Sequence, residues 1–109
     1  MDSWTQKCAR IEMLVLDVDG VLTDGRITYT DQGEEIKAFH VRDGSGLRIW
    51  TTTLGKHAGI ITGRRSAIVD RRAKELGIAS VIQGADDKRA ALASMIAPFG
   101  LSLDQVAVI

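Results

Sequence analysis

Met13-Leu14-Val15-Leu16-Asp17-Val18-Asp19-Gly20 is the stretch of sequence that decides the fold. Its first four residues form a continuous apolar run, which is typical of a short strand buried on both faces of a parallel sheet. Two aspartates follow where this strand ends, and Gly20 and Gly25 allow the backbone to turn sharply. We therefore predict a buried strand that presents two carboxylates at its carboxyl end.

Short apolar segments alternate with helical patterns along the rest of the chain. Strands are expected at residues 58–61, 78–82 and 106–109, and helices at residues 46–54, 66–76 and from residue 86 or 87 to about 98. Ser66 suits an N-cap, while Gly55 and Gly77 suit the C-terminal ends of helices. The alternation predicts the α/β class, with a Rossmann-like parallel sheet and helices on both of its faces.

Residues 26–41 follow a different pattern. Apolar β-branched and aromatic residues lie on both sides of the turn-forming sequence Asp31-Gln32-Gly33, which predicts a β-hairpin insertion. A hairpin is marginally stable by itself in water. We therefore expect it to pack against another surface, such as a second subunit.

The composition limits the classes of protein. A chain of 109 residues with 45% hydrophobic and 26% charged residues is expected to form a single globular domain over residues 1–109. The net charge is zero and the basic residues are spread along the chain, which argues against nucleic acid as a partner. Residues 1–10 lack the apolar core of a signal peptide, and no apolar run is long enough to span a membrane. With Cys8 as its single cysteine, the protein is expected in the reducing cytoplasm.

The last residues, Val106-Ala107-Val108-Ile109, form an apolar run that no turn follows. A chain rarely stops within a strand of this kind. We therefore expect the domain to be incomplete at its C-terminus.

Asp17 and Asp19 are the first candidates for chemistry. Two carboxylates so close together repel each other unless a cation such as Mg²⁺ lies between them, and hard cations prefer oxygen ligands. One carboxylate can then attack phosphorus, and the other can protonate the leaving oxygen and later activate water. The alternative is a turn in which both aspartates cap backbone amides. The apolar strand before the pair and Gly-Val-Leu-Thr-Asp after it favour catalysis.

Two further segments are expected at the same edge of the sheet, because ligands bind beyond the carboxyl ends of parallel strands. Thr62-Gly63 follows the second strand and offers a hydroxyl and backbone amides to a phosphate. Lys88 lies in the first turn of a helix, where its charge opposes the helix macrodipole, so it is expected to serve an anionic site. Taken singly, these would be an ordinary strand-to-helix turn and a surface lysine.

In their order and spacing these motifs resemble the haloacid dehalogenase-like phosphatase superfamily. The first motif is Asp17-Val18-Asp19-Gly20-Val21-Leu22-Thr23, the second is Ile61-Thr62-Gly63, and the third is Lys88. Gly33-Glu34-Glu35, Phe39-His40-Val41-Arg42-Asp43-Gly44 and Gly84-x-x-Asp87-Lys88 are similar to the 3-deoxy-D-manno-octulosonate 8-phosphate phosphatase subfamily in particular. The likeness runs from about Met13 to the end of the chain.

The resemblance implies roles for individual residues. Asp17 would be the nucleophile and a magnesium ligand, and Asp19 would be the general acid and base, binding Mg²⁺ through its backbone carbonyl. Lys88 would hold the phosphoryl group together with Thr62 and Gly63. Arg64 and Asp43 would contact the sugar acid.

The resemblance also implies properties of the whole molecule. The subfamily has no large cap domain, assembles as a homotetramer through the hairpin, and acts in lipopolysaccharide biosynthesis. Its fourth motif, a Gly-Asp-Asp-x-x-Asp loop with further magnesium ligands, would follow residues 106–109. We therefore expect the 109-residue form to bind Mg²⁺ weakly and to turn over poorly.

Other functions are compatible with the same residues. One is a nonulosonate 9-phosphate phosphatase, or a related regulatory domain of sialic-acid-type synthetases. Another is a non-catalytic oligomerisation module with a degenerate phosphatase site. A receiver-like phospho-acceptor domain shares the aspartate, threonine and lysine, but not the paired aspartates followed by a hairpin.

Overall fold

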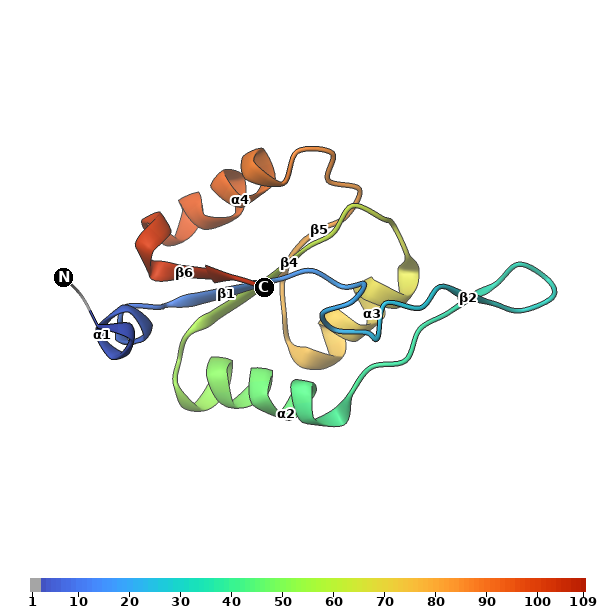
Figure 1. Ribbon diagram of the computed structural model, residues 1–109, viewed down its shortest axis with the longest axis horizontal. Coiled ribbons are helices and arrows are strands. Elements are labelled where there is room, and N and C mark those ends of the chain that lie inside the picture. The colour runs from blue at the N-terminus through green and yellow to red at the C-terminus, as the bar shows by residue number, and fades with distance from the viewer. Residues whose placement is uncertain (1–2) are drawn as a thin grey trace.

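The apolar segments of the sequence form the strands of one parallel sheet in the computed structural model, which describes residues 3–109 (Figure 1). Its strands are β1 (Met13–Leu16), β4 (His57–Ile61), β5 (Ser80–Ile82) and β6 (Val106–Val108), in the spatial order β5-β4-β1-β6. The first strand pairs with β4 on one side and with β6 on the other. This central position explains its continuous apolar run, since both faces of the strand are covered.

Helices connect these strands. They are α1 (Trp4–Ala9), α2 (Val41–Arg48), α3 (Ala67–Leu76) and α4 (Lys88–Ile96), with a π-helical turn at Ile49–Thr53 and 3₁₀ turns at Ala97–Phe99 and Leu103–Gln105. The Rossmann-like α/β architecture expected from the sequence is thereby confirmed. None of the helices within residues 3–109 is long and apolar enough to cross a membrane.

Helix α3 has the caps that its sequence predicts. The hydroxyl of Ser66 accepts a hydrogen bond from the backbone N–H of Ile68, and Gly77 ends the helix with a φ of 74°. A left-handed residue at this position favours glycine, because other side chains are strained there.

The prediction for α2 was wrong at its start. This helix begins at Val41, where His40 is the N-cap and accepts a hydrogen bond from the N–H of Arg42, rather than at residue 46. Gly44 and Gly46 weaken the helical pattern of this segment, because glycine is a poor helix former. Gly44 is buried, and a Cβ atom there would meet the guanidinium end of Arg72 and the side chain of Leu76, both on α3, so close packing of the two helices favours glycine despite its low helix propensity.

The core consists of two apolar layers, one on each face of the sheet. Leu16 and Ile60 pack against α2 and α3, whereas Met13, Val15 and Ile61 pack against Met95 and Ile96 of α4. Figure 1 shows α4 on one side of the strands and α2 on the other. Successive residues of β1 point to opposite faces, so four residues serve both layers.

The predicted hairpin is present, with short arms. It comprises β2 (Thr28–Tyr29) and the antiparallel β3 (Glu35–Ile36), and Tyr29 lies opposite Glu35. The hairpin projects from the rest of the molecule (Figure 1), and the longest dimension of the whole structure, hairpin included, is 53 Å. Ile27, Tyr29 and Ile36 are about half exposed on it.

Candidate active site

The carboxyl ends of β1 and β4 bring two of the predicted motifs to one edge of the sheet. Leu16 lies beside Ile60 in the parallel register, so Asp17 and Thr62 leave the sheet at the same edge. Strand β1 is also the point where the strand order reverses, with β4 and β5 on one side and β6 on the other. Open α/β sheets bind their ligands at such a switch point.

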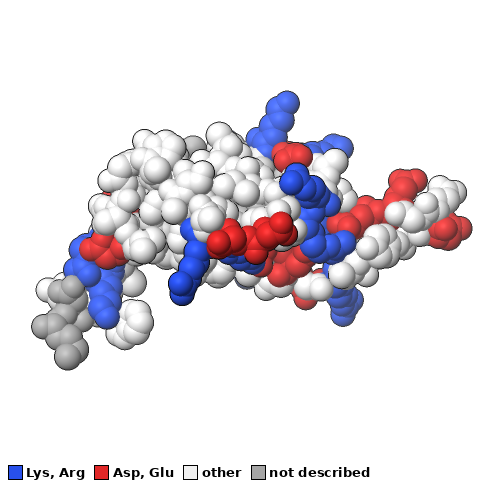
Figure 2. Space-filling model, turned by 90° about the horizontal axis from the view of Figure 1, so that it is seen from above, with Lys and Arg blue, Asp and Glu red and all other residues white. Residues whose placement is uncertain are grey.

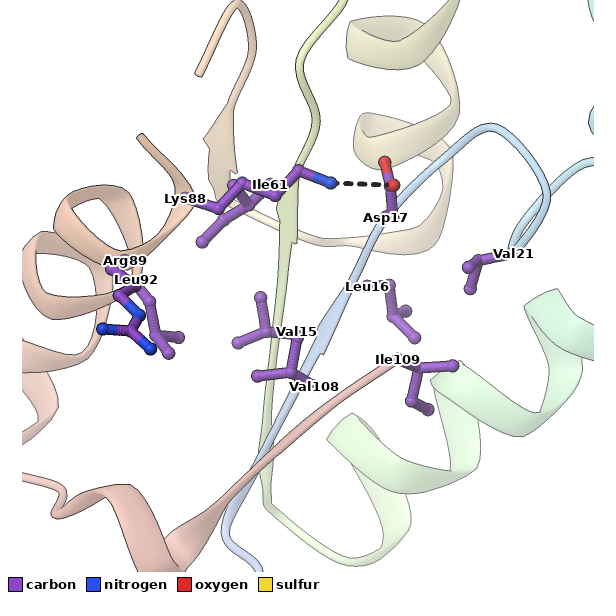
Figure 3. Close-up of a pocket in the computed structure, with 10 residues that line it drawn as sticks. All are labelled: Val15, Leu16, Asp17, Val21, Ile61, Lys88, Arg89, Leu92, Val108 and Ile109. Atoms are coloured by element: carbon purple, nitrogen blue, oxygen red, sulfur yellow. Dashed lines mark hydrogen bonds and ion pairs between the residues drawn. The ribbon is translucent and has the colours of Figure 1, made fainter. Parts of the chain in front are cut away.

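Asp17 is held as a carboxylate by two hydrogen bonds. Its Oδ2 accepts from the ammonium of Lys88 at 2.9 Å (Figure 3), and its Oδ1 accepts from the backbone N–H of Val18 at 2.7 Å. Partial burial by itself would raise the pKa of Asp17, but Lys88, the Val18 N–H and the Thr62 hydroxyl together lower it below its usual value. Asp17 is therefore ionised at neutral pH, as a nucleophilic carboxylate must be.

The loops after β4 and β5 are tied to each other. The backbone of Thr62 donates to the carbonyl of Ile82 at 3.0 Å and accepts from the N–H of Ala85 at 3.0 Å. The side chain of Gln83 accepts from the N–H of Ser66 at 2.7 Å and donates to Asp70 at 2.9 Å. These bonds fix the Thr62 turn relative to the segment that leads into Lys88, and Gln83 was not among the predicted site residues.

Lys88 begins α4 and reaches back over the sheet. Asp87 is the N-cap of this helix, because its carboxylate accepts from the N–H groups of Arg89 and Ala90. The cap fixes the first turn, from which the ammonium of Lys88 extends to Asp17. This contact joins residues that are 71 positions apart in the sequence.

Asp19 does not share the partner of Asp17. Its Oδ1 accepts from the ammonium of Lys37 at 2.8 Å, and its Oδ2 lies 3.9 Å from Arg64. Lys37 also pairs with Glu35 at 2.9 Å, and its side chain is only 3% exposed. Burial by itself would lower the pKa of Lys37, but its contacts with the carboxylates of Asp19 and Glu35 raise it above the usual value.

Glu35 and Lys37 are site residues that the sequence reasoning missed. A signal was present, because residues two apart on a strand lie on the same face. The opposite charges of Glu35 and Lys37 therefore lie on one face of the predicted hairpin arm, where both can contact the same group of charged residues.

Arg64 lies in the same group of charges, as its position after the second motif allows. Its Nη2 donates to Glu35 at 2.8 Å and lies 3.4 Å from the hydroxyl of Tyr29. Its Nη1 is buried and has no hydrogen-bond partner among the described residues. Arg64 is therefore close to Asp19 and retains an unused donor.

Asp43 lies in the first turn of α2. It lines a pocket with Leu47 and Trp50, and this pocket shares Leu16, Val21 and Ile109 with the pocket that Asp17 and Lys88 line. The structure does not bring it into contact with Asp17, Thr62 or Lys88, so its contact with a substrate stays a prediction.

An apolar cavity of about 380 Å³ adjoins Asp17 and Lys88 (Figure 3). Val15, Leu92 and Val108 are among the residues that line it, between α4 and the sheet. The charged pair lies at its border, so the reactive carboxylate is next to a surface from which water is partly excluded.

The donors at this edge fit a magnesium ion in kind. Each oxygen of Asp17 accepts one hydrogen bond and keeps lone-pair capacity for a cation. No group of three or more His, Cys, Asp or Glu that could hold a metal occurs within residues 3–109. Magnesium commonly binds through one or two carboxylates and completes its shell with water and substrate phosphate, so these donors suffice for a weak site.

Comparison with known proteins gives concordant results for sequence and structure. No family model matches the chain. It is 44% identical over 108 residues to 3-deoxy-D-manno-octulosonate 8-phosphate phosphatase of Yersinia pestis, which covers 99% of this chain and 57% of that protein. The Escherichia coli K12 enzyme of the same name is 41% identical over 103 residues, and the match covers 94% of this chain and 54% of that protein. The chain thus spans about half the length of the curated relatives it matches.

Solved structures agree. A Moraxella catarrhalis 3-deoxy-D-manno-octulosonate 8-phosphate phosphatase, in complex with magnesium, phosphate and the KDO molecule, has a TM-score of 0.89 and 50% identity, covering 94% of this chain and 59% of that one. A hydrolase of HAD superfamily subfamily III A from Legionella pneumophila has a TM-score of 0.89 and 40% identity, and the match covers 94% of this chain and 56% of that one.

The motif resemblance found in the sequence is thereby confirmed over nearly the whole of the described chain. This chain is a homologue of the 3-deoxy-D-manno-octulosonate 8-phosphate phosphatases, and its fold is that of the haloacid dehalogenase superfamily.

Proposed function

We propose that this protein is a phosphomonoesterase that hydrolyses 3-deoxy-D-manno-octulosonate 8-phosphate to 3-deoxy-D-manno-octulosonate and phosphate. The observation that carries the proposal is the ionised Asp17, paired with Lys88 at the switch point of the sheet. The choice of substrate is supported by the names of the relatives and by the magnesium, phosphate and KDO in the Moraxella catarrhalis structure.

The first half of the reaction transfers the phosphoryl group to Asp17. A carboxylate oxygen of Asp17 attacks phosphorus, the bond from phosphorus to the sugar oxygen breaks, and Asp19 gives its proton to that oxygen. Lys88 and the Thr62-Gly63 turn hold the phosphoryl oxygens and balance their charge. The products of this half are an aspartyl phosphate and the free sugar acid.

The second half regenerates the enzyme. Asp19, now ionised, takes a proton from a water molecule, whose oxygen attacks the phosphorus of the aspartyl phosphate. The bond between phosphorus and Asp17 breaks, and phosphate leaves. Asp19 has then recovered the proton that it gave up in the first half.

Magnesium, held by the carboxylate of Asp17 and the backbone carbonyl of Asp19, would neutralise negative charge on the phosphoryl oxygens. Arg64 and Asp43 would contact the sugar acid. The buried Nη1 of Arg64, which has no hydrogen-bond partner among residues 3–109, supports such a contact for Arg64.

Replacement of the nucleophile tests the proposal. Asp17→Asn removes the attacking charge but can still accept a hydrogen bond from Lys88. We expect turnover of phosphomonoesters to fall by at least about a thousandfold, as for the loss of a nucleophile, while the circular dichroism spectrum is unchanged. Asp104→Asn, an exposed carboxylate remote from the sheet edge, is the matched control and should keep full activity. An Asp17→Asn variant with wild-type rate would contradict the proposal.

The choice of substrate needs a separate measurement. A panel of eight- and nine-carbon 2-keto-3-deoxy sugar acid phosphates would be compared by kcat/KM. We expect the eight-carbon 8-phosphate to be preferred, since the Yersinia pestis and Escherichia coli relatives are named for that substrate. Preference for a nine-carbon 9-phosphate would assign the protein to the alternative substrate class.

We also propose that the protein assembles as a homotetramer through its hairpin. Ile27, Tyr29 and Ile36 expose apolar surface on a projecting element, which supports burial of this face against other copies. Ile27→Glu should lower the mass measured by light scattering. Leu103→Glu, the same kind of apolar-to-charged change at an exposed leucine outside the hairpin, should not. A wild-type protein that is monomeric at micromolar concentration would refute this assembly.

The proposed substrate also implies a place in the cell. A sugar acid phosphate is an intermediate of biosynthesis, so we propose that the protein acts in the cytoplasm on the route to lipopolysaccharide. Fractionation of cells that express a tagged copy of the whole protein would check its location.

A further inference from the structure

The two carboxylates of the Asp17–Asp19 pair have separate cationic partners from different parts of the chain. Lys88 of α4 binds Asp17 at 2.9 Å, and Lys37, which follows β3 of the hairpin, binds Asp19 at 2.8 Å. The first lysine is 55% exposed in its side chain and the second only 3%. Lys88 can therefore move with a ligand, whereas Lys37 is held in place.

Lys37 is held by a second carboxylate. Its ammonium lies 2.9 Å from Glu35 Oε1, and Glu35 Oε2 accepts from Arg64 at 2.8 Å. With Asp19 ionised, Asp19, Glu35, Lys37 and Arg64 form an ion cluster of two anions and two cations. When Asp19 carries the proton that it delivers as general acid, the cluster has one net positive charge. Figure 2 shows acidic and basic side chains meeting where the projecting hairpin leaves the rest of the molecule.

The oxygens of Asp19 differ in their contacts. Oδ1 accepts the hydrogen bond from Lys37, while Oδ2 is 3.9 Å from the nearest nitrogen of Arg64, which is too long for a hydrogen bond. A general acid must present a proton within hydrogen-bond reach of the leaving oxygen. Oδ2 is the oxygen of Asp19 that is free to carry that proton.

We propose that Lys37 is a positioning residue, which fixes Asp19 through Oδ1 so that Oδ2 delivers the proton to the leaving group. The inference rests on the proposed function, in which Asp19 is the general acid. It assigns the hairpin a part in the chemistry of this site in addition to any part in assembly. Loss of Lys37 would leave Asp19 free to turn towards water, and would leave Arg64 as the remaining cationic partner of Glu35.

The dependence of rate on the leaving group distinguishes this role from a structural one. An aryl phosphate such as p-nitrophenyl phosphate releases a stable phenolate without a proton, whereas a sugar alcohol must be protonated as it leaves. The ratio kcat/KM reports on the steps up to that departure. In Lys37→Met we expect kcat/KM for the sugar phosphate to fall by about a hundredfold, the usual contribution of a general acid. The value for p-nitrophenyl phosphate should fall much less.

Further variants complete the kinetic test. They are made in a polypeptide long enough to show phosphatase turnover. Asp19→Asn should show the same selective loss. Lys37→Met should add little to it, because both changes disable the same step, the delivery of a proton by Asp19. Lys37→Arg keeps the charge and should recover part of the rate on the sugar phosphate. Lys74→Met, on the exposed face of α3, is the matched lysine control and should change neither rate.

The outcomes separate this inference from the proposed function. If Asp17→Asn retains turnover, the proposed function fails. If Asp17→Asn is inactive but Lys37→Met lowers both substrates equally, or raises the rate on the sugar phosphate, the proposed function stands and the role of Lys37 is overturned.

A measurement without turnover tests the contact itself in the 109-residue chain. Lys37→Met, Asp19→Asn and the double variant would be unfolded in urea. We expect the two changes to be non-additive, so that the second alters the unfolding equilibrium constant several-fold less once the first is present. Additive effects would show that the ion pair does not form in solution. If Lys37→Met fails to fold, Lys37→Arg and Lys37→Gln take its place in both measurements.

Discussion

Asp17 and Asp19 are only two positions apart in the sequence, yet they have different surroundings in this molecule. Asp17 contacts Lys88 and the backbone of Val18, whereas Asp19 contacts Lys37. Since a carboxylate takes its charge state and orientation from its partners, the pair can divide the tasks of nucleophile and acid. At this scale the sequence predicted the aspartates, Thr62 and Lys88 as site residues, because each follows a recognisable strand or opens a helix.

Gly59 of β4 is a residue whose small size the packing requires. A Cβ atom there would overlap the sulfur of Met95 and lie 3.0 Å from the methyl carbon of Met13, both in the layer under α4. We expect Gly59→Ala to lower the free energy of unfolding by about 1–3 kcal/mol, the usual cost of overpacking a core.

Gly46 of α2 is the matched control for this change. No atom lies within 4 Å of its Cβ position, and the residue has ordinary helical geometry. Gly46→Ala should therefore raise the free energy of unfolding by roughly 0.5–1 kcal/mol. Urea denaturation of both variants measures the difference, and equal effects of the two would contradict the packing described for β4.

At the scale of elements, helix termini position the reactive groups. Helix α3 begins after the Thr62 turn and α4 begins at Lys88, so each helix N-terminus lies next to a predicted phosphate contact. The sequence left the N-cap of α4 open between two adjacent aspartates. The structure assigns it to Asp87, because only the carboxylate of Asp87 accepts hydrogen bonds from the first turn of the helix.

Asp87→Ala should lower the free energy of unfolding by about 1 kcal/mol, the usual value for an N-cap, and loosen the turn that carries Lys88. Asp87→Ser, which retains an oxygen acceptor, should recover most of the loss. The neighbouring change Asp86→Ala should cost less than about 0.5 kcal/mol, as for a surface position. Thermal unfolding of the three variants decides the matter; a larger loss at Asp86 than at Asp87 would reverse the assignment.

At the scale of the whole molecule, the sheet brings together residues from the first, second and third motifs. The ion would be held by the carboxylate of Asp17 and the backbone carbonyl of Asp19, and no group of three or more His, Cys, Asp or Glu that could hold a metal lies within residues 3–109. The site is therefore expected to bind Mg²⁺ without the affinity of a complete metal centre. An ion that binds only the folded state stabilises it by about 1.4 kcal/mol when present at ten times its dissociation constant.

Magnesium should accordingly raise the unfolding midpoint of the 109-residue chain by an amount that grows with concentration and vanishes in Asp17→Asn. Scanning calorimetry between zero and tens of millimolar MgCl₂ measures this, with Asp104→Asn as a control that keeps the effect. A shift of equal size in Asp17→Asn would mean that Mg²⁺ acts elsewhere on the molecule.

Local sequence patterns predict much of this fold, and their failures have physical causes. The strand at residues 13–16 and the helix between Ser66 and Gly77 were found because period, length and caps agree. The start of α2 was missed because Gly44 and Gly46 obscure a helix that its packing against α3 stabilises. Propensity is a local quantity, and it yields wherever burial contributes more free energy.

The amino-acid sequence by itself determined the order of strands and helices, the carboxylates at the end of β1 and the family resemblance, since all of these depend on residues close together along the chain. Only the tertiary structure decided which cation holds which carboxylate, and placed Asp43 in the pocket of Leu47 and Trp50. The contact of Lys37 with Asp19 depends on the direction in which the hairpin returns to the sheet. Packing of distant segments sets that direction, and no local pattern encodes it.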